Sequence, residues 1–588
     1  MSRAAGGRRA AAVLCLVVAL GLAGRAGAGP ADSRPRPAPA DPAESAAPVA
    51  QAPSPSAPGP APVAQPPAPA FLLELERVTP ESPAVRQARA LVLQGRDAEA
   101  LALLASLLQP PSSPAAASEP GAVEDRAHAH LVAAAVQERR GQMALALDHL
   151  RRALALVSRS VVVRLAIART YHLSGRTSDA IGVLEEARTI QPADPTVAAW
   201  LGSLYLAAGR PSSAVRILEE SSKNRASAAT LYNLGLAYQQ LGERTLARQA
   251  YERALAHDAT LASALNNLGV LAYQEGDGEG AQAYFRRAVE ADPTSFLYHA
   301  NLGATLRAQG LPERALEELE KAEALTSTPP ASLLVEMGLA RLSLGRFEEA
   351  ARAFEQVVRL APSHPDALWG LGVARMGQDR LEEAQAWLDR AVQANPGYWR
   401  AHHALAIVAQ RRADPASALE HYEQAIRRAP AVVALRTGLG ELYLQLGRPA
   451  EAQAQFQVAL GLAGPQPAVL YGLGRAQLMA GRAREAVVSF EGAAAAEPDA
   501  RRQGLYLYAA ALAYEAAGRL DDAVRTLQRA VAKDGELFEA QLRLGELLLA
   551  GGQVSEALEP LRRARALRPE DENARRALEW ATASSAGP

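Results

Sequence analysis

The sequence predicts an all-α protein, a solenoid built from a helix–turn–helix unit of 34 residues, and three observations predict it. The unit recurs from Glu81 to Asp571, and alanine fills the same place in the second half of all fourteen copies. Glycine or alanine stands twelve residues earlier in each copy, and glycine lies between these two places in twelve of the fourteen. Hydrophobic residues make up 49% of the chain but aromatic residues only 5%. Alanine must therefore supply much of the buried surface, which favours closely packed helices over sheets.

Residues 1–28 have the layout of a secretory signal peptide. Three arginines precede a fifteen-residue apolar stretch, 10–24, and residues 26–28 read Ala-Gly-Ala, an A-x-A cleavage site. The apolar stretch is short for a membrane span, and it contains the only cysteine, Cys15. We expect an exported protein, periplasmic or secreted, that begins at or near Gly29. The alternative is an uncleaved N-terminal segment that anchors the chain.

Residues 29–70 differ in composition from both neighbours, because fourteen of these 42 residues are proline and thirteen are alanine. Such a segment buries little apolar area and forms no regular hydrogen-bond ladder, so it predicts a disordered spacer. After it we expect a divergent N-terminal repeat or cap with a loop at 71–126, which includes a loop near 115–126. The main array is expected at 127–571, and a capping helix and tail at 572–588.

Each constant place in the repeat has a physical reason. The paired small residues are expected to let the two antiparallel helices of a unit approach closely. The mid-unit glycine follows the first helix, where a left-handed residue closes a helix C-terminus. Proline ends half of the units, as at Pro293 and Pro362, and stops the second helix. Leu231, Leu234 and Tyr238 are spaced to form an apolar stripe that one unit buries against the next.

At this point the chain resembles the tetratricopeptide repeat family. The L-x2-L-G-x2-Y, A-x3-F/Y and P signature of that family is plain in residues 228–261 and 262–295. The resemblance implies a right-handed superhelical solenoid in which the first helix of each unit lines a concave groove. Partners of such proteins, usually peptide segments, lie in this groove. Mapped onto this sequence, the groove-facing places are those of Trp200, Tyr232, Asn233, Asn266, Asn267, Tyr273, Asn301, Trp369, Tyr471 and Tyr508.

Three of these residues, Asn233, Asn267 and Asn301, stand 34 residues apart in consecutive units. An amide has donors and an acceptor, so it can pair with a peptide backbone without reading its sequence. The spacing is similar to the asparagine ladder of O-linked N-acetylglucosamine transferase, which holds an extended peptide. We expect these amides to be solvated in the free protein. The alternative is that recent duplication has copied an asparagine with no binding role.

The aromatic places in the C-terminal half have small neighbours (Gly370, Gly472 and Ala509), which predicts a surface for apolar side chains. No lysine lies beside the asparagines, so the family's clamp for an acidic C-terminus is not expected.

The sequence carries no pattern typical of catalysis, and we expect no enzyme, no cofactor and no metal. His128 and His130 are two residues apart on a helix, about 200° around its axis, so they cannot share a metal, and the adjacent His402 and His403 also diverge. The glycine cluster at 276–280 lacks a preceding strand and a Lys-Ser/Thr pair, so it is a turn. The formal net charge of −1 excludes a globally basic nucleic-acid binder.

The function that follows is a non-catalytic scaffold that binds an extended peptide or a partner subunit, within a cell-envelope assembly. One alternative is a periplasmic adaptor of a polysaccharide secretion machine. Another is the non-catalytic antenna of an enzyme complex. We expect protein or peptide partners, with no nucleic acid and no small-molecule substrate.

Overall fold

The computed structural model describes residues 82–109 and 121–585. The expected signal peptide at 1–28 and spacer at 29–70 lie outside these residues. Every regular element in the described ranges is a helix, and they contain no strand. The protein is therefore an all-α helical repeat solenoid, as the sequence predicts.

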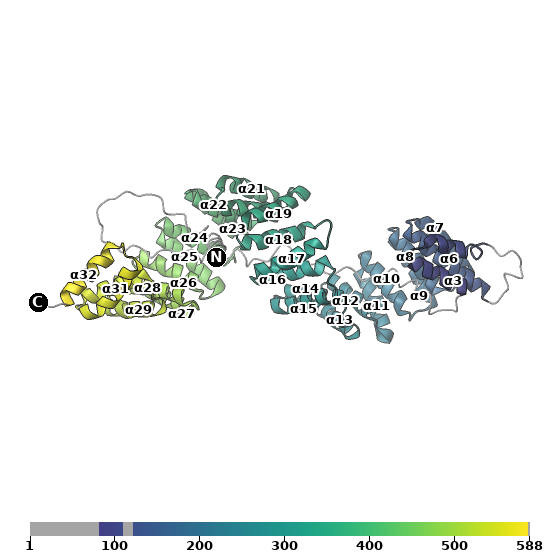
Figure 1. Ribbon diagram of the computed structural model, residues 1–588, viewed down its shortest axis with the longest axis horizontal. Helices are drawn as coiled ribbons and strands as arrows, with labels where there is room; N and C mark the ends of the chain where they lie inside the picture. The colour runs from purple at the N-terminus through teal and green to yellow at the C-terminus, as the bar shows by residue number, and fades with distance from the viewer. Residues whose placement is uncertain (1–81, 110–120, 586–588) are drawn as a thin grey trace. The chain divides into compact units, whose positions relative to one another are not determined.

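The described residues form two compact units, and α17 (Pro312–Ala324) contributes residues to both. The first, here the N-terminal unit, contains residues 82–309 and 321–327, and the second, the C-terminal unit, contains 310–320 and 328–585. The helices of the N-terminal unit are α3 (Pro83–Leu93), α4 (Asp97–Leu104), α6 (Ala122–Arg139), α7 (Met143–Leu156), α8 (Val161–Leu173), α9 (Thr177–Ile190), α10 (Pro195–Ala207), α11 (Pro211–Arg225), α12 (Ala228–Gln240), α13 (Arg244–His257), α14 (Ala262–Gln274), α15 (Gly278–Ala291) and α16 (Phe296–Ala308) (Figure 1).

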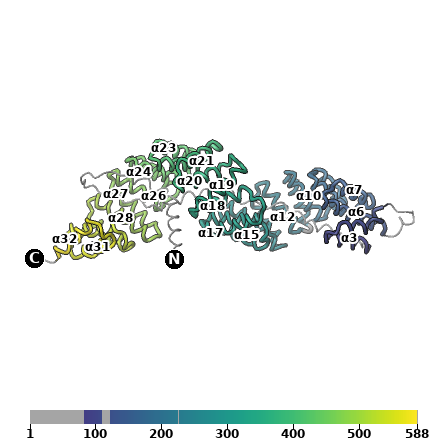
Figure 2. The backbone as a smooth tube through the Cα atoms, turned by 45° about the horizontal axis from the view of Figure 1, so that its top comes forward, coloured from purple at the N-terminus to yellow at the C-terminus, as the bar shows by residue number. Residues whose placement is uncertain are grey.

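The C-terminal unit continues the alternation of helices and ends on one further helix. Its members are α18 (Ala331–Ser343), α19 (Phe347–Leu360), α20 (Pro365–Gly377), α21 (Leu381–Ala394), α22 (Trp399–Arg411), α23 (Pro415–Arg428), α24 (Val433–Gln445), α25 (Pro449–Ala463), α26 (Pro467–Met479), α27 (Ala483–Ala496), α28 (Ala500–Ala516), α29 (Leu520–Lys533), α30 (Phe538–Ala550), α31 (Val554–Leu567) and α32 (Glu572–Ser585). Within each unit the helices follow one another in chain order (Figure 2).

A left-handed residue closes the first helix of every pair. Glycine fills this place in twelve pairs, with φ between 67° and 83°. The two pairs without glycine use Asp379 and Ala413, at φ 63° and 57°. The turn is sealed as a helix C-terminus usually is: in the α10–α11 pair the Arg210 amide donates to the Tyr205 carbonyl at 2.8 Å. The predicted role of the mid-unit residue is therefore confirmed in all fourteen pairs.

The small residue of the first helix makes room for a large side chain of the second helix. A methyl group placed on Gly235 would lie 2.5 Å from Cε1 of Tyr251, and one on Gly338 would lie 2.6 Å from Cζ of Phe354. In both pairs the large residue stands sixteen positions after the glycine. The sequence-based explanation, that the small residues let two backbones meet, is thus incomplete. In these two pairs a second-helix ring fills the space beside the first-helix glycine. The second-helix alanines, such as Ala281, are fully buried.

Two segments differ from the expected division. α6 begins at Ala122, so residues 122–126 are helical and are not part of a loop. Asp125 stabilises this start by accepting a 2.9 Å hydrogen bond from the Ser82 amide. The first helix α28 has seventeen residues, which makes it longer than the thirteen-residue first helices α26 and α30.

The apolar core runs along each unit through neighbouring pairs. In the N-terminal unit Leu184, Leu201 and Leu218 belong to one cluster that continues into α12 and α14. In the C-terminal unit a comparable cluster runs from Tyr471 to Ala581 on α32. Because each pair buries its apolar face only against adjacent pairs, the fold places first-helix side chains of successive repeats close to one another.

Candidate functional site

The ten residues predicted to face a groove all lie on first helices, but most of them are buried. Seven are in the N-terminal unit, on α10, α12, α14 and α16, and three are in the C-terminal unit, on α20, α26 and α28. Only Tyr273 and Tyr508 are half-buried. The eight buried residues are Trp200, Tyr232, Asn233, Asn266, Asn267, Asn301, Trp369 and Tyr471.

A chain of amide hydrogen bonds joins three consecutive repeats of the N-terminal unit. Nδ2 of Asn301 on α16 donates to Oδ1 of Asn266 on α14 at 2.7 Å, and Nδ2 of Asn266 donates to Oδ1 of Asn267 at 3.1 Å. Nδ2 of Asn267 then donates to the hydroxyl groups of Tyr251 at 3.2 Å and Tyr232 at 3.3 Å. The network therefore links α16 to α12 and α13 through α14.

This network corrects the expectation that the amides are solvated. Asn267 is fully buried and Asn301 is 4% exposed. An unpaired buried amide is costly, so the side chains of adjacent repeats satisfy one another. Sequence reasoning treated the 34-residue spacing as a ladder facing solvent, whereas Asn266 and the two tyrosines turn it into an internal network.

Asn233 differs from the other members of the expected ladder. Its Nδ2 group donates a long, 3.4 Å hydrogen bond to the Ala199 carbonyl. Its Oδ1 atom is buried and accepts no hydrogen bond within the described part of the chain. An amide oxygen can accept up to two hydrogen bonds, so Asn233 retains acceptor capacity in the free protein.

The aromatic residues of the C-terminal unit pack against other rings and arginines. Trp369 meets Tyr398 edge-on, with the ring centres 6.5 Å apart, and the guanidinium of Arg400 lies 5.8 Å from the Trp369 ring. Tyr471 lies against Tyr506, with the ring centres 5.0 Å apart. Burial and the nearby carboxylates raise the pKa of Tyr508 to about 12, so this hydroxyl is neutral at pH 7.

The small neighbours of these aromatic residues do not form an open apolar surface. A methyl group placed on Gly370 would lie 2.5 Å from Cζ of Phe354, and Gly472 is in the same relation to Phe456. Ala509 is also buried. The expected open surface is therefore absent beside Gly370 and Gly472, because second-helix rings of the preceding repeats already fill the space there.

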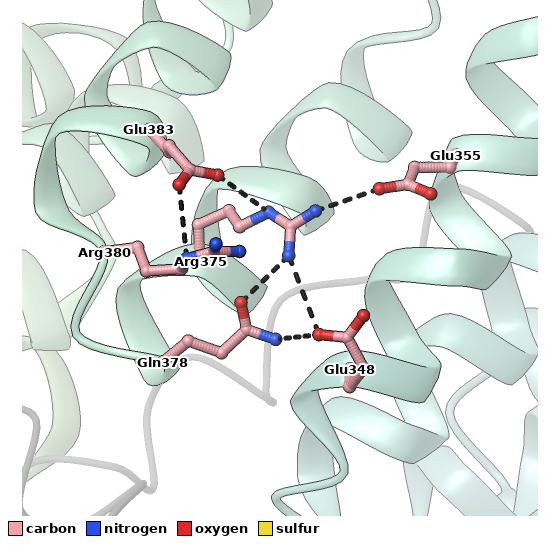
Figure 3. Close-up of polar contacts among 6 residues, drawn as sticks. All are labelled: Glu348, Glu355, Arg375, Gln378, Arg380 and Glu383. Atoms are coloured by element: carbon pink, nitrogen blue, oxygen red, sulfur yellow. Dashed lines mark hydrogen bonds and ion pairs between the residues drawn. The ribbon is translucent and has the colours of Figure 1, made fainter.

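Arg375 on α20 collects three carboxylates from neighbouring helices (Figure 3). The guanidinium lies 3.0 Å from Glu355, 3.4 Å from Glu383 and 3.8 Å from Glu348, and it donates to Oε1 of Gln378 at 2.9 Å. The Arg375 side chain is only 12% exposed, whereas its three carboxylate partners are 37–65% exposed. The positive charge of Arg375 is therefore paired with carboxylates of its own chain.

Arg375 occupies the place that tyrosine holds in other repeats. Tyr205 donates to Glu185 at 2.7 Å, and Tyr238 donates to Glu219, each on the second helix of the preceding repeat. Burial and the hydrogen bond to Glu219 raise the pKa of Tyr238 to about 12. A polar link between successive repeats is therefore kept although its donor changes.

Two pairs of histidines that the sequence analysis missed face each other within single repeats. Nδ1 of His130 on α6 lies 3.0 Å from Nδ1 of His149 on α7, and Nδ1 of His402 on α22 lies 3.5 Å from Nδ1 of His421 on α23. Both pairs occupy the same repeat places, four residues before the first-helix small residue and three after the second-helix alanine. Aligning the repeats by these places would have revealed the pairing, whereas comparing histidines adjacent in sequence did not.

The described residues contain no cluster of three or more His, Cys, Asp or Glu side chains placed to hold a metal ion. Among the helices in the described ranges, none is long and apolar enough to cross a membrane.

Comparison with known proteins identifies the repeat. The family models described as tetratricopeptide repeat match residues 139–204, 173–234, 232–296, 266–331, 335–398, 403–467, 443–501 and 508–572. A search of the curated proteins finds no match.

Among solved structures the chain is similar to the APC/C hetero-tetramer Cut9–Hcn1, at 15% identity and a TM-score of 0.42, covering 78% of this chain and 96% of that one. It is also similar to a tetratricopeptide repeat protein from Parabacteroides merdae, at 20% identity and a TM-score of 0.35, covering 44% and 99% of the two chains. A third is YrrB, described as having an unusual peptide-binding site, at 25% identity and a TM-score of 0.29, covering 32% and 95%.

The family models together match well over half of the sequence, and the fourteen helix pairs have the architecture that the repeat requires. Proteins built from these repeats are generally non-catalytic scaffolds that bind protein or peptide partners. The chain belongs to the tetratricopeptide repeat family.

Proposed function

We propose that the protein is a non-catalytic scaffold that binds an extended peptide segment along the first helices of its N-terminal unit, near α12 and α14. The observation that carries the proposal is the Oδ1 atom of Asn233, which is buried and accepts no hydrogen bond from the described residues. Leaving a buried acceptor unpaired costs about 1–3 kcal/mol. A backbone N–H group of a bound segment would remove that cost once the Asn233 side chain turns toward it.

Of the four asparagines expected to face a groove, only Asn233 is proposed to bind a partner. Asn266, Asn267 and Asn301 are engaged with one another, so they position the repeats. Asn233 is left as the amide that pairs with a partner, and the half-buried Tyr273 lies on the first helix of the next repeat, α14. One amide contributes about 0.5–1.5 kcal/mol as a neutral hydrogen bond, so most of the affinity would come from other contacts.

Site-specific photo-crosslinking tests the location. Ala229 is exposed on α12, one helical turn before Asn233, and Glu252 is exposed on the second helix, α13. A photoreactive amino acid at position 229 should give a discrete adduct with a partner in an envelope extract, whereas the same group at 252 should not. Equal labelling from both positions, or none from 229, would contradict the proposed location.

A second step tests Asn233 itself. Once mass spectrometry has identified the cross-linked segment, its affinity is measured for the wild-type protein and for Asn233→Ala. We expect a loss of about two- to tenfold, in keeping with one neutral hydrogen bond. If the affinity is unchanged and the variant is folded, a bound water rather than the partner would donate to Oδ1 of Asn233.

We also propose that the scaffold acts in the cell envelope, with the pattern of residues 1–28 as support. Sequencing the N-terminus of the mature protein should give a start at or near Gly29. A start at Met1 or Ser2 in the membrane fraction would support the anchored alternative.

A further inference from the structure

The two histidine pairs have the same repeat places but different geometry. The Nδ1 atoms of His130 and His149 are 3.0 Å apart, an ordinary distance for a hydrogen bond between a protonated and an unprotonated ring nitrogen. The Nδ1 atoms of His402 and His421 are 3.5 Å apart, which is long for such a bond. Two nitrogen ligands about 2.0–2.1 Å from a tetrahedral zinc ion are about 3.4 Å apart, close to the second separation.

The charges around the two pairs also differ. Three carboxylates act on His421: Asp389 from α21, Glu420 from its own helix, and Asp414 at the start of that helix. Arg428 and His421 act on His402 in the opposite sense. These acidic groups outnumber the single arginine, so the neighbourhood of the pair favours a cation.

The pair on α6 and α7 has the reverse setting. Arg152 and Arg126 act on His130, and one carboxylate, Asp148, opposes them. A cation placed between His130 and His149 would be repelled by two guanidinium groups. The two pairs therefore have histidines at the same repeat places but opposite local charge.

We propose that His402 and His421 bind one divalent transition-metal ion, such as Zn²⁺, through their two Nδ1 atoms. Imidazole nitrogen is a preferred ligand for zinc, copper and nickel. Both rings would carry their proton on Nε2, leaving the Nδ1 lone pairs free for the metal. Water would complete the coordination, because the described residues offer no third protein ligand at this site. His421 is half-buried, so the ion can arrive from solvent.

Such an ion would join α22 to α23 within one repeat. Both rings keep their places on packed helices, since His402 is 6% exposed and sits in the line of buried residues 401–409. A two-ligand site exchanges its metal more readily than a closed structural site with four ligands. The role that follows is metal-dependent stiffening of this repeat.

Isothermal titration of the untagged, chelator-treated full chain with ZnCl₂ tests the proposal. The wild type should show one saturable site, and His421→Gln and His402→Gln should each weaken it at least tenfold. The matched variant His149→Gln, at the place equivalent to 421, should leave the affinity within twofold of the wild type. Circular dichroism melting without metal shows whether each variant is folded.

A spectroscopic readout separates this site from the other histidines. The EPR spectrum of one equivalent of bound Cu²⁺ should show imidazole nitrogen coupling in the wild type and in His149→Gln, and lose it in His421→Gln. Absence of a saturable site in the wild type would overturn the proposal. Equal losses in His421→Gln and His149→Gln, or unchanged binding in both, would also overturn it.

Discussion

Asn267 on α14 and Tyr251 on α13 are sixteen residues apart, and the amide Nδ2 group donates to the phenol oxygen at 3.2 Å. The same Tyr251 ring lies against Gly235, sixteen residues earlier, on the first helix of its own repeat. One second-helix side chain thus contacts the first helices of two successive repeats. Phe354 repeats the arrangement, with glycine sixteen residues away on both sides.

Replacing Asn267 by alanine should lower the free energy of unfolding by about 1–3 kcal/mol, because the change leaves buried hydrogen-bonding groups of Asn266, Tyr232 and Tyr251 with fewer partners. Chemical denaturation followed by circular dichroism measures the effect. Asn573→Ala is the matched control, since Asn573 is exposed on α32 and should change stability by less than about 0.5 kcal/mol. Similar small effects from both variants would show that the amide network does not stabilise the fold.

Gly370→Ala should destabilise the C-terminal unit, because the added methyl group would lie 2.5 Å from Cζ of Phe354. Overpacking of this kind costs about 1–3 kcal/mol. Gly461→Ala on α25 has the same chemistry in open space, with nothing within 4 Å of the new methyl group. This control should stabilise its helix by about 0.5–1 kcal/mol, so thermal melting should move in opposite directions for the two variants.

Ala413→Gly should stabilise the α22–α23 turn. Ala413 has φ of 57°, a left-handed conformation that costs a residue with a Cβ atom about 1–2 kcal/mol, partly offset by the greater backbone entropy of glycine. The expected net gain is about 0.5–1 kcal/mol. Gly447→Ala tests the reverse change at φ 67° in the next turn and should lose a similar amount. If both variants lost stability, the turn would be fixed by contacts other than backbone conformation.

Ala281→Leu and Ala384→Leu should each destabilise the protein by about 1–3 kcal/mol, because both alanines are fully buried between helices. In a repeat array the damage should remain near the altered pair. Hydrogen exchange followed by mass spectrometry should show lost protection around α14–α16 for the first variant and around α20–α22 for the second. Uniform loss across all fourteen pairs would contradict local coupling.

Stability should fall on acidification through the titration of His403, because burial lowers its pKa to about 4. The unfolded chain binds this proton at a pKa of about 6.5, so protonation favours unfolding. The stability that neutral His403 contributes is fully present above about pH 6.5 and is lost as the pH falls toward 4. The loss is on the order of 3 kcal/mol.

The His403 ring lies against Tyr422, with the ring centres 5.9 Å apart. His403→Gln removes this titration while keeping a polar side chain beside Tyr422. Denaturation midpoints between pH 7 and pH 4 should therefore decline less steeply for the variant than for the wild type. Parallel declines would assign the acid sensitivity to other groups, including His130, whose pKa is also lowered to about 4 by burial.

The fold followed from the sequence because its determinants are local and recur with a fixed period. Glycine at twelve turns predicted a left-handed residue there, and Asp379 and Ala413 adopt that conformation because the two helices around each turn require it. The resemblance to tetratricopeptide repeats rested on the same period, and the family models confirm it.

The candidate site was less predictable, because periodicity gives the place of a residue but not what lies opposite. Asn267 was expected in solvent, yet a tyrosine sixteen residues earlier covers it. Gly370 was expected beside an open surface, yet Phe354 fills that space. The His402–His421 pair requires the register between two helices, which inspection of adjacent histidines does not supply.

The ring shared by two repeats also limits how this gene can change by unequal recombination. Any crossover between units separates a ring from one of its two neighbours. Joining α19 to α14 would set the Asn267 amide against the phenyl ring of Phe354, which has no hydroxyl group to accept its hydrogen bond. Joining α19 to α26 would instead bring Phe354 against Gly472, which already accommodates Phe456. Units should therefore be exchanged in evolution only where the first helix of the incoming unit can pack against the second-helix ring of the unit before it.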